Sequence, residues 1–110
     1  MGQSIFEISR KYTIRDAVMY VDGSVVSKIV AKNDAGNITL FAFDKGQNLS
    51  EHTAPFDAIV HVIEGKANIR IGGRDYTLSD GELIIMPANI PHAVEAVESF
   101  KMLLTMLKAT

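Results

Sequence analysis

Short runs of apolar or alternating residues, divided by Gly, Asn, Asp and Pro, follow one another from residue 24 to the C-terminus. Alternation with a period of two, punctuated by turn residues, is typical of β-strands joined by tight turns. The pattern predicts eight strands, at residues 25–30, 38–43, 58–63, 67–71, 74–78, 83–86, 92–96 and 100–107. Because no helical run separates them, we expect an all-β sandwich or barrel and no βαβ unit.

The segment before residue 24 carries the only helical pattern in the chain. Thr13 stands in a capping position ahead of Ile14, Ala17 and Val18, which have helical spacing. We therefore expect one short helical turn in an N-terminal arm, residues 1–23, followed by a barrel over residues 24–110. A chain of 110 residues with 47% hydrophobic residues has the size of one domain with one core, so we expect a single domain.

The predicted strand at residues 58–63 and the segment 102–107 of the last predicted strand are apolar on both faces. A lone two-layer sandwich buries only one face of each sheet, so the second face needs a cover. Either the N-terminal segment or a second subunit could supply it, and we expect a homodimer.

Charge and composition narrow the choice of partner. The 11 basic and 13 acidic residues are scattered and give a net charge of -2, which indicates neither nucleic acid nor a membrane surface as partner. The chain has no cysteine, no leader-like segment and no apolar run long enough to span a bilayer, so a cytoplasmic location is expected. A small-molecule ligand fits this composition best.

Two segments carry candidate chemistry. Residues 46–65 read GQNLSEHTAPFDAIVHVIEG, and residues 81–96 read GELIIMPANIPHAVEA. Each begins with glycine, and together they contain all three histidines of the chain. Asn89 follows a proline at a place where a left-handed turn residue is needed, a conformation that asparagine tolerates well.

The two segments resemble the two motifs of the cupin superfamily, and the residues at motif spacing are Gly46, His52, Gly65, Gly81, Pro87 and His92. The resemblance implies a double-stranded β-helix, the RmlC-like jelly-roll barrel. It also implies a divalent metal inside the barrel, held by two histidines and a glutamate of the first motif and one histidine of the second. His52 and His92 match, but Ala54 and Ala58 stand at the places of the other two ligands.

Strand parity indicates which side chains share the barrel interior. In the resemblance His52, Ala54, Ala58 and Val60 face inward, whereas Asp57 and His61 have the opposite parity and should point outward. A β-bulge after Pro55 would reverse this assignment. The expected pocket residues are His52, His92, Ala54, Ala58, Val60 and Met86, with Met102 and Met106 either lining the cavity or packing in the core.

Three interpretations of His52 and His92 remain open: a weak site for zinc, nickel, iron or manganese, a metal-free ligand site, and hydrogen-bonded core residues. The two alanines would enlarge the cavity and favour a hydrophobic or aromatic ligand. We expect a small-molecule-binding protein, the alternative being a metal-dependent dioxygenase, isomerase or decarboxylase. A dyad of His52 with Asp57, similar to that of metal-free epimerases in the family, is opposed by parity.

Overall fold

The computed structural model describes residues 5–108. Within them a 3-10 turn, η1 (Ile14–Asp16), precedes the strands. The nine strands are β1 (Val25–Asn33), β2 (Gly36–Phe43), β3 (Asn48–His52), β4 (Asp57–Glu64), β5 (Lys66–Ile71), β6 (Arg74–Ser79), β7 (Leu83–Met86), β8 (His92–Ala96) and β9 (Phe100–Leu107). No helix in these residues is long enough to cross a membrane.

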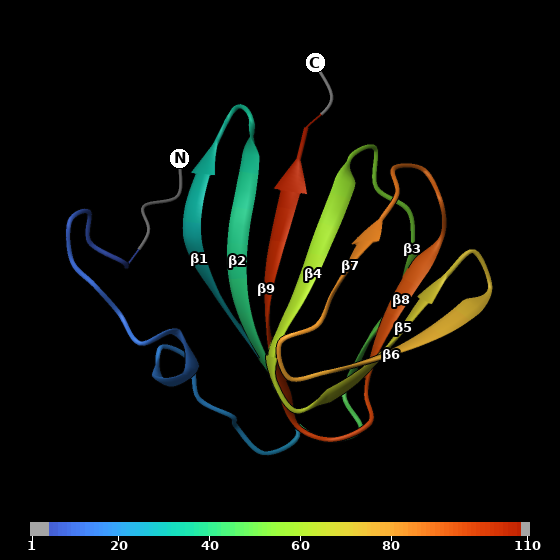
Figure 1. Cartoon of the computed structure of the whole chain (residues 1–110), viewed down its shortest axis with the longest axis horizontal. Helices are drawn as coiled ribbons and strands as arrows, with labels where there is room; N and C mark the ends of the chain where they lie inside the picture. The colour runs from blue at the N-terminus through green and yellow to red at the C-terminus, as the bar shows by residue number, and fades with distance from the viewer. Residues whose placement is uncertain (1–4, 109–110) are drawn as a thin grey trace.

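The strands form two antiparallel sheets (Figure 1). The five-stranded sheet has the order β1-β2-β9-β4-β7, and the four-stranded sheet has the order β3-β8-β5-β6. Strands distant in the sequence lie side by side, since β9 pairs with β2 on one side and with β4 on the other. The all-β jelly-roll prediction is therefore confirmed.

The main core lies between the two sheets. Phe43 and Phe100 stack there with ring centroids 4.6 Å apart and an interplanar angle of 14°. Ala58, Val60 and Val62 alternate with more exposed residues along β4 and point into this core. The inward parity expected for Ala58 and Val60 is confirmed, and no bulge after Pro55 reverses it.

A second core cluster forms on the outer face of the five-stranded sheet. Val18 of the N-terminal arm is fully buried against Leu40 and Ala42 of β2. The hydroxyl of Tyr20 donates to the Glu64 carboxylate at 2.7 Å, which ties the arm to the end of β4. The arm therefore covers part of the second apolar face, the first of the two covers considered above.

The strand β3 was missed by the sequence prediction. Its five residues are polar except for Leu49 and mostly exposed, so they show no alternation. Thr13 is the residue before η1, but its side chain makes no capping hydrogen bond, so the expected side-chain cap is wrong. The two-residue turn at Gly72-Gly73 joins β5 to β6 with positive φ at both glycines, as a primed hairpin turn requires.

Candidate functional site

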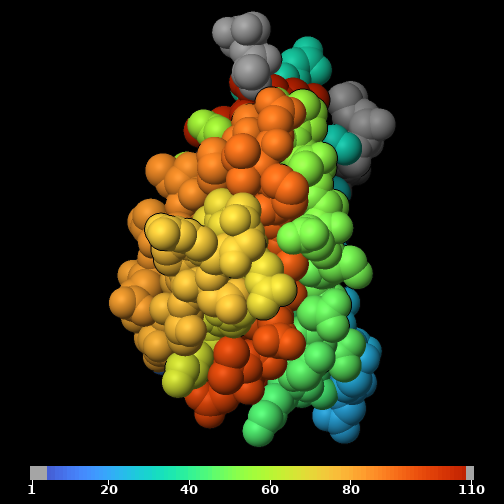
Figure 2. Space-filling model, turned by 90° about the vertical axis from the view of Figure 1, so that its right-hand side faces the viewer, coloured from blue at the N-terminus to red at the C-terminus, as the bar shows by residue number. Residues whose placement is uncertain are grey.

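The site is built where β3 pairs with β8 in the four-stranded sheet. This register sets His52 directly opposite His92, with a break in the ladder between Leu49 and His52. The Nε2 atoms of the two rings lie 3.2 Å apart, and the ring planes meet at 74°. In Figure 2 the green segment that includes β3 runs beside the orange and yellow strands of this sheet.

Backbone carbonyls fix the tautomer of both rings. His52 Nδ1 lies 2.7 Å from the Ser50 carbonyl oxygen, and His92 Nδ1 lies 3.2 Å from that of Ile90. A carbonyl oxygen only accepts, so each Nδ1 must carry the ring proton. Each neutral ring then turns an Nε2 lone pair toward the other, and two facing lone pairs repel. One cation shared by the two Nε2 atoms relieves this repulsion, either a proton on the line between them or a metal ion to one side of that line.

Burial makes the two histidines unequal. His92 is only 2% exposed, whereas His52 is exposed to solvent. Burial lowers the pKa of His92, the charge of the neighbouring His52 lowers it further, and the Ile90 carbonyl acts in the opposite direction. His92 therefore takes up a proton less readily than an unburied histidine does.

A small cavity adjoins the two rings inside the barrel. Its volume is about 40 Å³, and it is lined by Leu49, His52, Ala54, Ala58, Met86, His92, Val94, Met102, Leu104 and Met106. A single water needs roughly 10–15 Å³ by this measure, so the cavity has room for only a few atoms. Met86, Met102 and Met106 line this cavity together with Ala54 and Ala58, as one of the two interpretations of the methionines expected.

Five of the six residues expected in the pocket are brought together around this cavity. The exception is Val60, which is fully buried in the main core and does not line the cavity. Three lining residues were not foreseen: Leu49, Val94 and Leu104. Val94 was the one within reach of sequence reasoning, because it lies two residues after His92 and shares its face.

The third histidine lies apart from this site. His61 is exposed on the outer face of the five-stranded sheet, opposite Leu83 of β7 and Leu103 of β9. The outward orientation predicted by parity is thus confirmed. His61 offers a natural control for any experiment on the other two histidines.

Asp57 also points away from the pair. Its carboxylate accepts a hydrogen bond of 2.8 Å from the Ala88 backbone N–H and so holds the turn before β8. Among the hydrogen bonds of residues 5–108, none links this carboxylate to His52. The alternative dyad of His52 with Asp57 is not formed.

The donor set fits a divalent metal in spacing but not in number. Two nitrogen ligands at about 2.0–2.1 Å from a tetrahedral zinc stand about 3.3 Å apart, close to the separation of the two Nε2 atoms. Yet nowhere in residues 5–108 do three or more His, Asp or Glu side chains form a cluster that could hold a metal. A metal held here would take two protein ligands and rely on solvent or a small ligand for the rest.

A jelly-roll barrel with a histidine pair inside defines the class of protein, a cupin-type barrel with a reduced ligand set. The family model described as the cupin domain matches residues 39–107, which is more than half of the chain. The chain therefore belongs to the cupin family. No match was found among curated proteins.

Solved structures agree with this assignment. A conserved protein of unknown function from Streptococcus pyogenes is 35% identical with a TM-score of 0.92, over 100% of this chain and 97% of that one. A cupin 2 conserved barrel domain protein from Leptotrichia buccalis is 39% identical with a TM-score of 0.85, over 88% of this chain and 47% of that one. A cupin superfamily protein from Desulfitobacterium hafniense shares the fold, with 24% identity and a TM-score of 0.89 over 98% and 100% of the two chains.

Proposed function

We propose that this cupin is a small-molecule-binding protein whose binding site is the facing pair of His52 and His92. The observation that carries the proposal is the distance of 3.2 Å between two Nε2 atoms whose Nδ1 atoms both face backbone carbonyls. A pair that shares one cation carries a positive charge beside the cavity. The ligand is then a molecule with an anionic oxygen, such as a carboxylate or phenolate, that pairs with this charge or binds a metal held there.

The cavity supports a ligand with a short apolar part next to that donor. Apart from the two imidazoles, its lining is aliphatic or thioether. A volume of about 40 Å³ admits a methyl or ethyl group at most, whereas drug-sized ligands occupy roughly 300–1,000 Å³. Because His52 is exposed, the remainder of a longer ligand would lie outside the barrel, unless the methionines change rotamer.

A divalent metal is the second form that the cation can take. The two imidazoles would hold zinc, nickel, iron or manganese weakly, since structural and catalytic sites normally use three or four protein ligands. When bound, the metal would supply a Lewis acid with open positions for the ligand's oxygen. The enzymatic alternative, a metal-dependent dioxygenase, isomerase or decarboxylase, gains no support from the two-ligand set.

The test is native mass spectrometry and elemental measurement on untagged protein fresh from cells. We expect a co-purified small molecule, with or without a substoichiometric metal, in the wild type and in His61→Ala. The small molecule and any metal should be lost in the double variant His52→Ala with His92→Ala. Zinc titration of the purified protein should give one site with a Kd above about 1 µM, abolished in the double variant.

Two results would contradict the proposal, and both are measured on variants shown to be folded. A compound retained at full occupancy by a folded double variant would place the ligand elsewhere. Zinc binding that His61→Ala removes and the double variant keeps would assign the metal to the outer face. Circular dichroism of each variant establishes that the barrel is intact. Cytoplasmic location stays a prediction that these measurements do not address.

A further inference from the structure

A row of polar side chains crosses the outer face of the four-stranded sheet. The strand registers place four residues opposite one another, one on each strand in the order of the sheet: Asn48, Glu95, Asn68 and Thr77. These side chains point away from the main core, since the alternate residues Ala67, Ile69 and Val94 are the buried ones. Figure 2 looks onto this sheet, with the green segment that includes β3 and the yellow β5–β6 hairpin in view. The sheet therefore presents hydrogen-bonding groups to solvent along this row.

A groove lies along part of this row, over β3, β8 and β5. It has a volume of about 190 Å³. Five polar side chains line it: Asn48, Ser50, Asn68, Arg70 and Glu95. Ala93 of β8 stands opposite Arg70 and contributes only a methyl group, which leaves a hollow between the longer side chains. Since a water needs roughly 10–15 Å³ by this measure, the groove has room for roughly a dozen non-hydrogen atoms, the size of one hexose.

Asp75 of the neighbouring strand β6 holds two of the lining side chains in place. Its Oδ1 accepts hydrogen bonds from Arg70 Nε at 2.9 Å and from Asn68 Nδ2 at 3.2 Å. An amide has two N–H donors and a carbonyl acceptor, and a guanidinium has five donors, so both groups keep capacity for a ligand. The guanidinium and the amide are therefore oriented before any ligand arrives.

The other polar groups of the groove are free to bind. Within residues 5–108 the side chains of Asn48, Ser50 and Glu95 form no hydrogen bond with another residue. Glu95 supplies only acceptors, Asn48 supplies both donors and acceptors, and the Ser50 hydroxyl can do either. The groove thus sets donors and acceptors side by side within a space of about 190 Å³.

The charges around the groove disfavour an ionic ligand. Arg70 is already paired with Asp75, and Glu95 and Glu51 also lie close enough to interact with its charge. An anion would therefore meet an excess of carboxylates. A cationic amine brings donors only and would leave the N–H groups of Arg70 and the two asparagines unmatched. A neutral molecule whose groups both donate and accept suits this lining best.

We propose that this groove is a binding site for a neutral carbohydrate, held through one pyranose ring. Each ring hydroxyl both donates and accepts, as the mixed lining requires. The Glu95 carboxylate accepts from adjacent hydroxyls, the amides of Asn48 and Asn68 pair with the hydroxyls beside them, and the less polar face of the ring rests on the Ala93 methyl group. The ring is either a free monosaccharide or one unit of a longer glycan, because the groove is open along the sheet.

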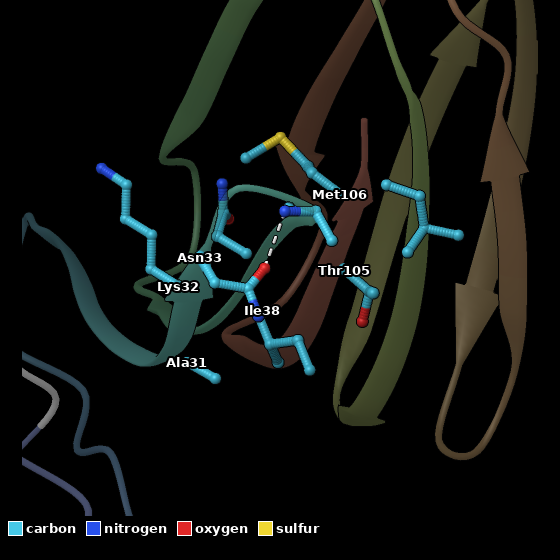
Figure 3. A pocket seen from close by; sticks show the side chains of 10 residues that line it. Ala31, Lys32, Asn33, Ile38, Thr105 and Met106 are labelled. Atoms are coloured by element: carbon cyan, nitrogen blue, oxygen red, sulfur yellow. Dashed lines mark hydrogen bonds between the residues drawn. The ribbon is translucent and has the colours of Figure 1, made fainter. Parts of the chain in front are cut away.

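A second surface hollow, in the five-stranded sheet, offers different chemistry. Figure 3 shows it at the end of β1 and β2, with Ala31, Ile38 and Met106 among its labelled side chains. Its volume is about 150 Å³, and no carboxylate or guanidinium of the described residues lines it. Asn33 there uses its side-chain oxygen to accept from the Ala35 N–H at 2.8 Å. A ligand rich in hydroxyls therefore finds better partners in the groove of the four-stranded sheet.

The inference does not rest on the proposed function of the histidine pair. The groove lies on the outer face of the four-stranded sheet, and the cavity beside His52 and His92 lies on its inner face. Leu49 and Val94 belong to the lining of both, so the sheet itself separates the two sites. A sugar in the groove leaves the two imidazoles untouched.

The test is an NMR titration of the ¹⁵N-labelled full chain with glucose, galactose, mannose and maltotriose, each up to about 50 mM. At least one sugar should shift the side-chain amides of Asn48 and Asn68 and the backbone amide of Ala93, with a Kd of about 1–10 mM. Sorbitol, which has the hydroxyls without the ring, and inorganic phosphate should shift them at least about tenfold less at the same concentration. Shifts by maltotriose alone would identify a glycan chain as the ligand, and equal shifts by one monosaccharide a free sugar.

Three variants locate the sugar. Glu95→Ala removes the acceptor and Ala93→Tyr fills the hollow, and each should weaken binding at least about tenfold. Glu98→Ala removes an exposed carboxylate in the turn before β9, outside the groove, and should bind as the wild type does. The double variant His52→Ala with His92→Ala should also keep the sugar-induced shifts.

Each contrary result overturns the proposal. Absence of shifts at Asn48, Asn68 and Ala93 with all four sugars excludes the site, and equal shifts with sorbitol exclude recognition of a ring. Binding that survives Glu95→Ala, or that Glu98→Ala weakens as much, places the sugar elsewhere. If Ala93→Tyr failed to fold, Glu95→Ala at the exposed surface would decide. Sugar-induced shifts lost only in the histidine double variant would assign the sugar to the barrel interior.

Discussion

Ala54 and Ala58 stand beside the two imidazoles, where each contributes only a methyl group. In the cupin resemblance these positions carry a histidine and a glutamate. The difference leaves a site with two neutral nitrogen donors and no anionic ligand, which suits a single exchangeable cation better than a tightly held metal. Alanine at positions 54 and 58 therefore leaves the two imidazoles as the only possible metal ligands among the four motif positions.

Restoring both ligands should convert the pair into a metal site. We predict that Ala54→His with Ala58→Glu binds zinc at least about tenfold more tightly than the wild type, measured by calorimetry, because four donors replace two. Ala58 is only 2% exposed, so the buried carboxylate should lower the melting temperature in chelator and raise it with zinc.

The matched control for that pair of substitutions is Ala54→Gln with Ala58→Gln, which adds similar volume without adding a carboxylate or an imidazole. It should show no gain in zinc affinity. An unchanged zinc affinity in the His and Glu variant, with an intact barrel, would mean that positions 54 and 58 do not face the pair.

At the scale of elements, the turns at the ends of the strands hold the two sheets in place. Gly65 lies between β4 and β5 with φ of +95°, and a Cβ atom there would lie 2.1 Å from the Ser99 carbonyl oxygen. Gly46 has a similar φ of +86°, but a Cβ atom there would meet nothing within 4 Å. These two glycines begin and end the first motif, but only at Gly65 does a neighbouring backbone segment leave no room for a side chain.

This contrast gives a stability prediction. Gly65→Ala should lower the free energy of unfolding by about 3 kcal/mol or more, because the left-handed conformation and the clash with Ser99 both count against it. Gly46→Ala should cost about 1 kcal/mol, from the backbone conformation alone. Urea denaturation of both variants measures the difference. Equal losses would show that the turn after β4 moves freely enough to admit the methyl group.

The strands that contain apolar or alternating runs could be predicted from the sequence, and the polar strand β3 could not. Apolar runs predict β4 and β9, whereas β3 is a polar edge strand whose position depends on its pairing with β8. His52 lies at the end of that missed strand. The sequence therefore pointed to both histidines through their motif positions but not to the strand pairing that sets them face to face.

The size of the cavity was likewise out of reach of sequence reasoning. Alanines at two ligand positions suggest an open interior, but Met86 of β7 and Met102 and Met106 of β9 line the same cavity. Flexible, unbranched side chains fill irregular gaps, and whether they do so depends on packing across the sheets. Motif positions alone carry no such information.

At the scale of the whole molecule, the histidine pair and the N-terminal arm use opposite layers of the sandwich. The histidine pair belongs to β3 and β8 of the four-stranded sheet, and the arm packs on the outer face of the five-stranded sheet. Variants at the exposed Ile85 of β7 should therefore leave ligand binding unchanged.

The most direct test of the account is ¹⁵N NMR of the three imidazole rings as a function of pH, in chelator, with His61→Gln to assign the outer ring. We predict that His52 and His92 both carry the proton on Nδ1, and that the resonances of His92 change when His52 is replaced but not in His61→Gln. The lowered pKa of His92 means that its ring stays neutral below the usual value of about 6.5.

The lowered pKa of His92 also determines whether stability rises or falls with pH. Just below pH 6.5, His92 is protonated in the unfolded chain but stays neutral in the folded chain. The free energy of unfolding should therefore fall as pH drops below about 6.5. Replacement of His52 by Gln should move the His92 titration toward its ordinary range. Nε2-protonated rings, with no response of His92 to the replacement of His52, would contradict the facing pair on which the proposed function rests.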